Sequence, residues 1–238
     1  MPPAGITFTG VRVLAGERQL LEVPDLHLTE QRISVIGPNG GGKSTLLQLM
    51  NSLIEPSYGH VSVNGLDTID AGSDVRQQVG FVFANPAAQL VMPTPLEDVE
   101  LSLRGRIKNS RERRAAVRDC LEQLGIADLA ERSSHEISAG QQQLVALATV
   151  VVLKPRLLLL DEPTTLLDRV NAGRFMHTVE QMCTAQQIQI VTAAHDLQLA
   201  ARAQRCLMIE DGAISLDGAP AEVINEYIRR TDHASLPA

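Results

Sequence analysis

A glycine-rich run, GPNGGGKST, occupies residues 37–45 and ends in a lysine and two hydroxyl side chains. Glycines let backbone N–H groups turn inward around phosphate oxygens, and a helix that begins there adds the positive end of its dipole. Lys43 can reach β- and γ-phosphates, and the hydroxyl of Ser44 can ligate Mg²⁺. The run fits the pattern G-x-x-x-x-G-K-[ST] between a strand-like RISVIG and a helix-like LLQLM, which disfavours a turn with a chance lysine. The sequence therefore predicts that a nucleoside triphosphate binds at Gly37, Pro38, Asn39, Gly40, Gly41, Gly42, Lys43, Ser44 and Thr45.

Two carboxylates end a strongly apolar run, LLLLDEP, at residues 157–163. Ligands of α/β proteins bind at the carboxyl ends of the sheet strands, so Asp161 and Glu162 are placed for chemistry. Asp161 can hold Mg²⁺ through water, and Glu162 can polarise the water that attacks the γ-phosphate. The alternative, an acidic pair that merely caps a strand, is disfavoured because a phosphate loop precedes the pair in the same chain.

A third run, HEISAGQQQLVALA, spans residues 135–148 and opens an apolar helix shortly before the acidic pair. A serine N-cap followed by an Ala-Gly turn would account for its first residues on their own. The order of the three motifs, however, resembles that of the ATP-binding cassette (ABC) ATPases, whose signature is commonly written LSGGQ. Here the signature reads ISAGQ at 137–141, with one glycine replaced by alanine. The resemblance implies that four residues of one subunit touch the γ-phosphate held by the other: Ser138, Ala139, Gly140 and Gln141.

The same resemblance assigns roles to three further positions. His195, in VTAAHD, corresponds to the switch histidine that contacts the γ-phosphate, although a lone histidine would otherwise be read as structural. Asp168, in TTLLD, corresponds to the D-loop carboxylate at the dimer interface. Ala84, in FVFANP, stands where the family carries the Q-loop glutamine, which helps to ligate Mg²⁺ and senses the membrane partner. Alanine offers no oxygen, so we expect slower hydrolysis with nucleotide binding retained, and we expect Gln89 not to reach the metal. The expected catalytic residues are Lys43, Glu162 and His195.

The run NPAAQLVMPTPLEDV at 85–99 narrows the resemblance to ATPases of energy-coupling-factor (ECF) importers, which take up vitamins and transition metals. With the N-terminal run ITFTGVRVLAGERQLLEV, the chain looks most like the ATPase subunit of the biotin importer. Another vitamin, or cobalt or nickel, is the alternative cargo.

The resemblance also implies partners. A transmembrane coupling protein would be gripped in a groove near Val91 and Met92, for which a place in the core is an equally good reading, and a second membrane protein would bind the substrate. Two ATPase subunits, most simply a homodimer, would sandwich two Mg-ATP at the cytoplasmic face of the cell membrane. Closure of the pair would then move the membrane partner, and hydrolysis would reset it.

The elements that position these residues follow from hydrophobic periodicity. Short apolar runs before residue 30, broken by glycine, Glu-Arg and Pro-Asp, predict an antiparallel ribbon, and HVSVNG predicts a strand closed by an Asn-Gly turn. RLLLLDEP and IQIVTAAHD are typical of parallel strands buried on both faces, with a helix at 169–186 between them. Asn109 and Glu112 fit a capping box, and Gly125 a helix stop.

These elements predict an α/β fold of the P-loop NTPase (ABC ATPase) type, as one domain over residues 1–238. Its parts are a nucleotide-binding core at 1–85 and 155–230 with an N-terminal antiparallel β subdomain, an inserted helical subdomain at 86–154 that carries the signature, and a short tail at 231–238.

Composition excludes further classes of protein. A chain of 238 residues that is 44% hydrophobic can bury a substantial core, and a net charge of −7 argues against a polyanion binder. Cys120, Cys183 and Cys206 lack metal-ligand spacing and are expected to be buried free thiols. The longest apolar run, LVALATVVVL, is about half the ~20 residues that a membrane-spanning helix needs, and MPPAGITFTG shows no secretory signal.

One segment, RGRIKNSRERRAAVR at 104–118, runs against the overall charge with seven basic residues. An ABC ATPase that acts on nucleic acid or ribosomes would need such a patch, but those relatives usually carry two cassettes or large insertions. A solvated basic helix face, with anionic lipid headgroups as a secondary neighbour, is favoured, and no nucleic-acid partner is expected. A P-loop kinase or GTPase is disfavoured because ISAGQ and His195 would have no role in it.

Overall fold

The computed structural model describes residues 5–234, which form two compact units. One unit consists of the chain up to Val79 and from Gln189 onward, and the other is Gly80–Ile188. The first four residues of MPPAGITFTG and the last four of the predicted tail lie outside the described residues. None of the helices within residues 5–234 is long and apolar enough to cross a membrane.

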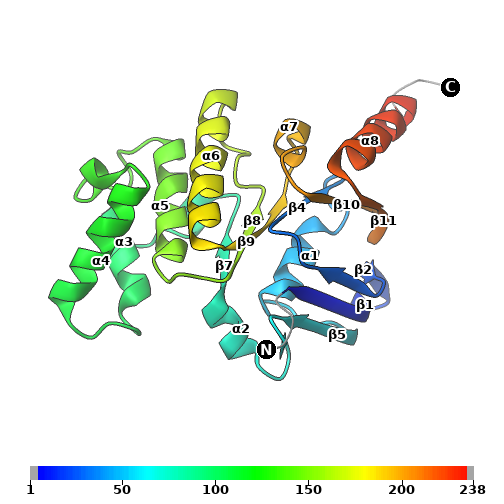
Figure 1. Ribbon diagram of the computed structural model, residues 1–238, viewed down its shortest axis with the longest axis horizontal. Coiled ribbons are helices and arrows are strands. Elements are labelled where there is room, and N and C mark those ends of the chain that lie inside the picture. Colours follow the sequence, from blue (N-terminus) through cyan, green and yellow to red (C-terminus); the bar gives the residue numbers. More distant parts are fainter. Residues whose placement is uncertain (1–4, 235–238) are drawn as a thin grey trace. The chain divides into compact units, whose positions relative to one another are not determined.

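The first unit contains a mixed β-sheet (Figure 1). Its strands are, in chain order, β1 (Ile6–Ala15), β2 (Arg18–Val23), β3 (Leu26–Leu28), β4 (Arg32–Ile36), β5 (Tyr58–Val63), β6 (Leu66–Asp67), β9 (Gln189–Ala193), β10 (Arg205–Glu210) and β11 (Ala213–Gly218). Their order across the sheet is β6-β5-β1-β2-β11-β10-β4-β9, with β3 also paired to β1. The pairs of β1 with β2, β3 and β5 are antiparallel, as predicted for the N-terminal runs. The pairs of β4 with β9 and with β10 are parallel.

The buried strands of this unit carry the apolar runs. Four consecutive residues of β4 and four of β9 are buried, which agrees with the predicted covering of both faces. The predicted turn after HVSVNG is present, with positive φ angles at Asn64 (51°) and Gly65 (80°).

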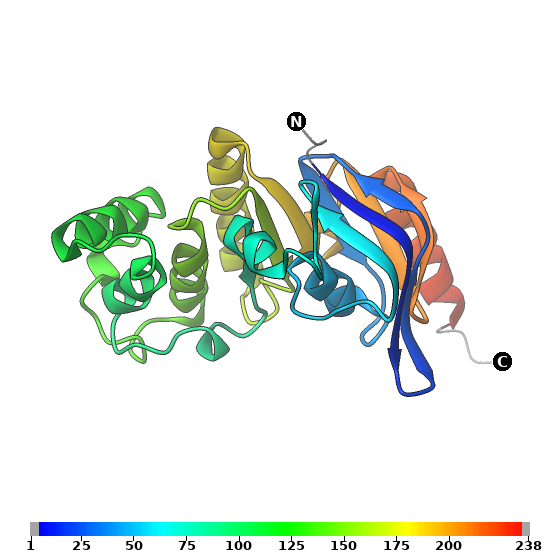
Figure 2. The same cartoon turned by 90° about the horizontal axis from the view of Figure 1, so that it is seen from below.

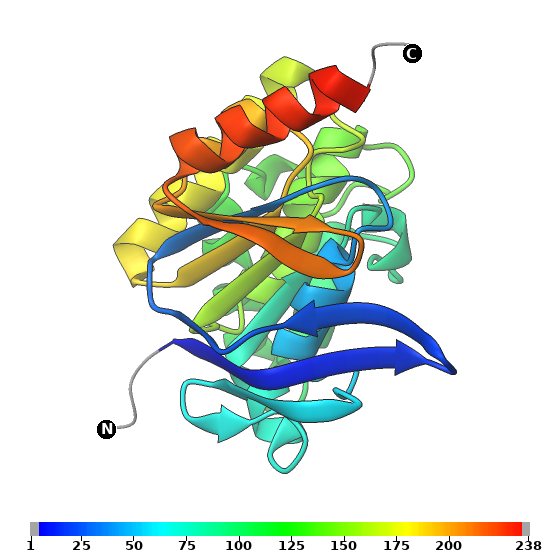
Figure 3. The same cartoon turned by 90° about the vertical axis from the view of Figure 1, so that its right-hand side faces the viewer.

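Among residues 5–234, four helices belong to the first unit: α1 (Lys43–Met50), α2 (Gly72–Gln78), α7 (Leu197–Ala200) and α8 (Pro220–Ala234). Figure 3 shows α8, in red, lying across the orange strands β10 and β11, where Val223 and Ile224 pack with Cys206 and Met208. Helix α8 continues through residues 231–234, within the segment predicted as a short tail.

The second unit is mostly helical (Figure 2). Its elements are, in chain order, β7 (Val79–Val82), the short 3₁₀ helix η1 (Pro86–Ala88), α3 (Pro95–Leu103), α4 (Ser110–Gln123), the 3₁₀ helix η2 (Ala127–Leu129), α5 (Ala139–Val151), β8 (Leu157–Asp161) and α6 (Arg169–Gln186). Asn109 is the N-cap of α4 and accepts the N–H groups of Arg111 and Glu112, which is one half of the predicted capping box. Gly125 follows that helix with a φ of 70°. The predicted helix at 169–186 coincides with α6.

The two units do not follow the predicted subdomain boundaries. Strand β8 and helix α6, which we assigned to the core, fall within Gly80–Ile188 together with the helical segment 86–154. Helix α6 packs against α5, the helix that begins at the signature. The assignment of β8 and α6 to the nucleotide-binding subdomain stays a prediction.

Candidate functional site

The predicted phosphate loop lies between β4 and α1, which confirms its strand–loop–helix frame. Gly37 has a φ of 141°, and a Cβ atom there would lie 2.0 Å from the carbonyl oxygen of Ile209. Only glycine fits this close approach of two backbone segments. Gly40 and Gly42 also have positive φ angles, 76° and 114°. The close approach at Gly37 and the positive φ angles at Gly40 and Gly42 explain why glycine occupies these positions in the loop before α1.

Helix α1 begins without a capping side chain. Gly42 is its N-cap residue in a left-handed conformation, and no side chain hydrogen-bonds to the first turn as a cap. In contrast, α3, α4, α5 and α6 each begin at a residue whose side chain accepts backbone N–H groups. Helix α2 also begins without a side-chain cap, so it is the glycine loop at the positive end of α1 that fits nucleotide phosphates.

Lys43 is held within the loop. Its side chain is almost fully buried, and Nζ donates hydrogen bonds to the carbonyl oxygens of Gly37 and Pro38, each at 3.0 Å. Backbone oxygens of the loop itself thus orient the ammonium group at the phosphate cradle.

His195 lies at the same edge of the sheet as the phosphate loop. Strands β4 and β9 are parallel neighbours, with Val35 opposite Ala193, so the residues that follow their carboxyl ends lie side by side. Gly37 follows β4 and His195 follows β9. The next residue, Asp196, caps α7 through a 2.8 Å bond from the N–H of Gln198 and so fixes the turn that carries the histidine. The structure therefore brings these two predicted elements together.

The acidic pair sits in the second unit, at the end of β8. Asp161 is the last residue of the strand, and both carboxylates are half-buried. Glu162 has a φ of 50°, a left-handed conformation that is uncommon for a residue other than glycine. The hydroxyl of Thr165 contacts a carboxylate oxygen of Glu162 at 3.5 Å. Such a backbone is often found at working sites, where neighbouring structure holds a residue in an unfavourable conformation.

The signature begins helix α5. The Oγ atom of Ser138 accepts the N–H of Gln141 at 3.3 Å, and Oε1 of Gln141 accepts the N–H of Ser138 at 2.9 Å, which makes a capping box. The N-cap reading of the serine is thus confirmed, and it is compatible with a second role because Ser138 and Ala139 are exposed.

Asp168 begins α6 in the same way, accepting the N–H groups of Val170 and Asn171 at 2.9 Å each. The hydrogen bond from the Asn171 backbone is the main reason why the pKa of Asp168 lies below its usual value. A Cβ atom on Gly140 would lie 3.7 Å from Leu167 and 3.8 Å from Asn171. The signature and the segment around Asp168 are therefore neighbours within the second unit.

Ala84 is half-buried in the loop between β7 and η1. Gln89, which we expected not to replace the missing glutamine, uses its amide nitrogen to bind Ala146 O and Thr149 Oγ1, both on α5 and both at 2.9 Å. Sequence reasoning missed Gln143, which is 1% exposed and donates to the carbonyl oxygen of Phe83 at 3.2 Å. The sequence feature that could have revealed Gln143 is a polar residue among the apolar residues of the helix predicted to begin at the signature.

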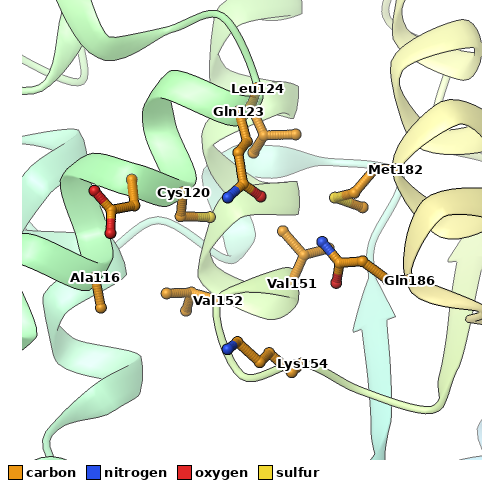
Figure 4. A pocket seen from close by; sticks show the side chains of 10 residues that line it. Ala116, Cys120, Gln123, Leu124, Val151, Val152, Lys154, Met182 and Gln186 are labelled. Carbon is orange, nitrogen blue, oxygen red and sulfur yellow. The ribbon is translucent and has the colours of Figure 1, made fainter.

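Two of the cavities in the structure are lined wholly by residues of the second unit. A groove of about 330 Å³ runs beside η1, and its apolar residues are Ala87, Leu90, Val91, Met92 and Pro93. Val91 is 70% exposed, so the alternative of a core position does not hold for it. A smaller cavity of about 150 Å³ lies where α4, α5 and α6 end, and the side chains of Cys120 and Met182 line it (Figure 4). None of the predicted site residues lines the smaller cavity, and Cys120, Cys183 and Cys206 are free buried thiols as predicted.

Comparison with known proteins identifies the family to which this chain belongs. The sequence model of the ABC transporter family matches residues 25–165, more than half of the chain, and the chain belongs to that family. It is 37% identical to the biotin transport ATP-binding protein BioM of Rhizobium etli, over 93% of this chain and 97% of that protein. It is 35% identical to the energy-coupling factor transporter ATP-binding protein EcfA1 of Halalkalibacterium halodurans, over 89% of this chain and 77% of that protein.

A solved structure agrees with the fold. A dimeric ATP-binding cassette in a post-hydrolysis state, bound to ADP and phosphate, superimposes with a TM-score of 0.79 at 26% identity, over 90% of this chain and 98% of the other. The predicted ABC ATPase fold and the resemblance to ECF-type ATPases are thus confirmed, and the chain is an ATPase whose hydrolysis is coupled to transport.

Proposed function

We propose that the chain is the ATPase subunit of an ECF-type importer that takes up biotin, attached to the cytoplasmic face of the cell membrane through a transmembrane coupling protein. The observation that carries the proposed attachment to a membrane partner is the apolar groove beside η1, with Val91 exposed at its surface. The biotin assignment is supported by the 37% identity to BioM. Another vitamin, or cobalt or nickel, is the alternative cargo.

In this proposal the residues of the chain divide the work of hydrolysis. Backbone N–H groups of the loop 37–45 and the ammonium of Lys43 bind the β- and γ-phosphates. Glu162 accepts a proton from the attacking water, and His195 contacts the γ-phosphate. Ser44 and Asp161 would hold Mg²⁺, which when bound neutralises charge on the phosphates.

A second ATPase subunit completes each site, and a homodimer is the simplest arrangement. The signature residues of one subunit would contact the γ-phosphate held by the other; they are Ser138, Ala139, Gly140 and Gln141. Two large apolar side chains near Asp168 are exposed, Leu166 at 56% and Val170 at 63%. An exposed apolar pair beside a predicted interface residue favours a surface that another subunit covers.

The rival function, an ABC ATPase that acts on nucleic acid, rests on the basic segment 104–118. Several of its cations are engaged within the second unit. Arg113 and Arg114 bind Glu100, Arg118 binds Glu131, and Arg106 donates to the carbonyl oxygen of Leu153. Cations that hold the helical segment together favour a structural role over a nucleic-acid surface, and we keep the rival only as an outcome of the test.

Affinity purification of the chain from detergent-solubilised native membranes tests the proposal. We expect two integral membrane proteins to come with it, one carrying bound biotin. Val91→Asp places a charge in the groove and should lose both, whereas Ile69→Asp, at another exposed apolar residue, should retain both. A different bound vitamin or metal would correct the cargo. Recovery of nucleic acid or ribosomes without membrane proteins would overturn the importer assignment.

A further inference from the structure

The backbone of Phe83, next to Ala84, is bound on both sides by glutamine side chains. The amide nitrogen of Gln143 donates to the carbonyl oxygen of Phe83 at 3.2 Å, and the amide oxygen of Gln89 accepts the N–H of Phe83 at 3.4 Å. Gln143 lies near the start of α5, two residues after the signature, and is buried. The beginning of the loop after β7 is thereby fastened to the helix that carries the signature.

Gln89 fastens the same loop to α5 a second time. Its amide nitrogen donates to the carbonyl oxygen of Ala146 and to Oγ1 of Thr149, each at 2.9 Å. Both donor hydrogens and the acceptor oxygen of this side chain therefore have partners in the second unit. A side chain with all these bonds is held in one orientation, so the loop cannot shift along α5 without breaking several of them.

The far end of the loop is fixed to α3. The Oδ1 atom of Asp98, which is 3% exposed, accepts the N–H groups of Val91 and Met92 at 2.9 Å each. Residues 83–92 thus form a strap that is bound to α5 at its start and at Gln89, and to α3 at its end. The strap also supplies the exposed face of Val91 to the groove.

We propose that Gln89 and Gln143 are positioning residues that make the strap and the signature turn move as one body. The inference rests on the proposed function, in which a membrane partner occupies the groove and the signature contacts a nucleotide. The simpler alternative is that both amides only satisfy buried polar groups of the helical segment. The alternative predicts no link between nucleotide binding and the strap, and this difference can be measured.

Hydrogen exchange of the full chain, measured by mass spectrometry with and without Mg-ATP, tests the link. We use Glu162→Gln as the parent, because it is expected to hold ATP without turnover, and compare peptides that cover 83–92 and 138–144. In the parent, ATP should slow exchange in both segments. In the parent with Gln89→Leu and Gln143→Leu, the strap should exchange about tenfold faster without ATP and lose its response, while the signature keeps its own. Gln186→Leu, at an exposed amide that ends α6, is the control and should behave as the parent.

A strap that still responds to ATP in the double variant would overturn the positioning role alone. If neither segment of the parent responds and ATP does not bind, the proposed function fails as well, so the two failures are distinguishable. Should the double variant not fold, Thr149→Val removes one acceptor of Gln89 with little change of shape. It should weaken the response of the strap, and Thr149→Ser, which keeps the hydroxyl, should restore it.

Discussion

Replacing Glu100 by glutamine should destabilise the helical part of the chain, because this carboxylate holds the basic segment 104–118. Glu100 is 7% exposed. Its Oε1 accepts bonds from Nε and Nη2 of Arg113 at 3.2 and 3.0 Å, and its Oε2 accepts one from Nε of Arg114 at 3.3 Å. Arg113 also donates to the carbonyl oxygens of Ile107 and Lys108, so the same guanidinium closes the connection between α3 and α4.

The size of the effect follows from how well each partner is shielded from water. Removing one member of a buried ion pair costs about 3–5 kcal/mol of unfolding free energy. Glutamine keeps one carbonyl acceptor, and the side chain of Arg114 is 61% exposed and can be solvated, whereas that of Arg113 is only 14% exposed. We therefore expect a loss of about 2 kcal/mol, within the range for hydrogen bonds to charged groups. For a chain of this size the loss corresponds to a decrease in Tm of about 4–8 °C.

Glu131→Gln is the matched control, because Glu131 and Arg118 form an ion pair whose side chains are 78% and 63% exposed. Its removal should cost about 0–1 kcal/mol, since water and salt screen an exposed pair. Both variants and the wild type are compared by thermal denaturation at pH 7. A decrease for Glu100→Gln no larger than that for Glu131→Gln would refute the argument from burial.

A pH series separates the charge of Glu100 from its packing. Burial would raise the pKa of Glu100, but the hydrogen bonds from Arg113 and Arg114 outweigh burial and hold the pKa below its usual value. A carboxylate with a lowered pKa in the folded state stabilises the protein above its unfolded pKa of about 4.3 and loses that contribution as the pH falls through the folded value. The gap between wild type and Glu100→Gln should therefore shrink below pH 4. A gap that does not change with pH would mean that packing, and not the ion pair, causes it.

Glu162→Gln should bind ATP and form a stable dimer without turnover, because an amide cannot accept the proton of the attacking water; chromatography with Mg-ATP measures this, and unchanged hydrolysis would remove Glu162 from the catalytic set. Ala84→Gln should raise steady-state ATPase activity by supplying the absent oxygen ligand, and unchanged activity would mean that water serves the metal equally well. The thiols should resist iodoacetamide at pH 8 in the folded chain and react in denaturant, since burial raises the pKa of Cys120 to about 11 and those of Cys183 and Cys206 to about 12. Rapid labelling of the folded chain would contradict their buried placement.

Local patterns predicted most of the fold, and the differences have local causes too. Helix α6 begins and ends as predicted because Asp168 caps it and Gln187, with a φ of 56°, ends it. The runs ITF and VRVL were predicted as separate pieces broken at Gly10, but they form one strand, β1. Gly10 has a φ of 54°, and the pairing of β1 with β5 shifts register beside it, so the glycine makes a bulge within the strand instead of ending it.

The phosphate loop could be predicted because it is a short run with its own chemistry, whereas the acidic pair and the signature were predicted from their order in the chain and from the family resemblance that this order implies. Sequence reasoning named Gln89 without its partners and missed Gln143, and both glutamines act over long separations in the chain. Gln89 binds α5 across 57 and 60 residues, and Gln143 binds Phe83 across 60. A glutamine carries no local sign of such a partner, since its contacts depend on how the helices pack. Only the placement of Gln143 among apolar neighbours of α5 hinted that it had a partner inside the unit.

A double-mutant cycle can test whether the strap is needed for a glutamine at position 84, where this chain has alanine, to act. If Gln89 and Gln143 set the position of the loop, a glutamine introduced at 84 can act only while the strap is in place. The increase in ATPase activity from Ala84→Gln should therefore disappear when Gln89→Leu and Gln143→Leu are also present, which is a non-additive result. If the new glutamine found the metal without help from the strap, the two effects on activity would multiply. That result would limit Gln89 and Gln143 to the stability of the helical segment, because the loop would then reach its working position without them.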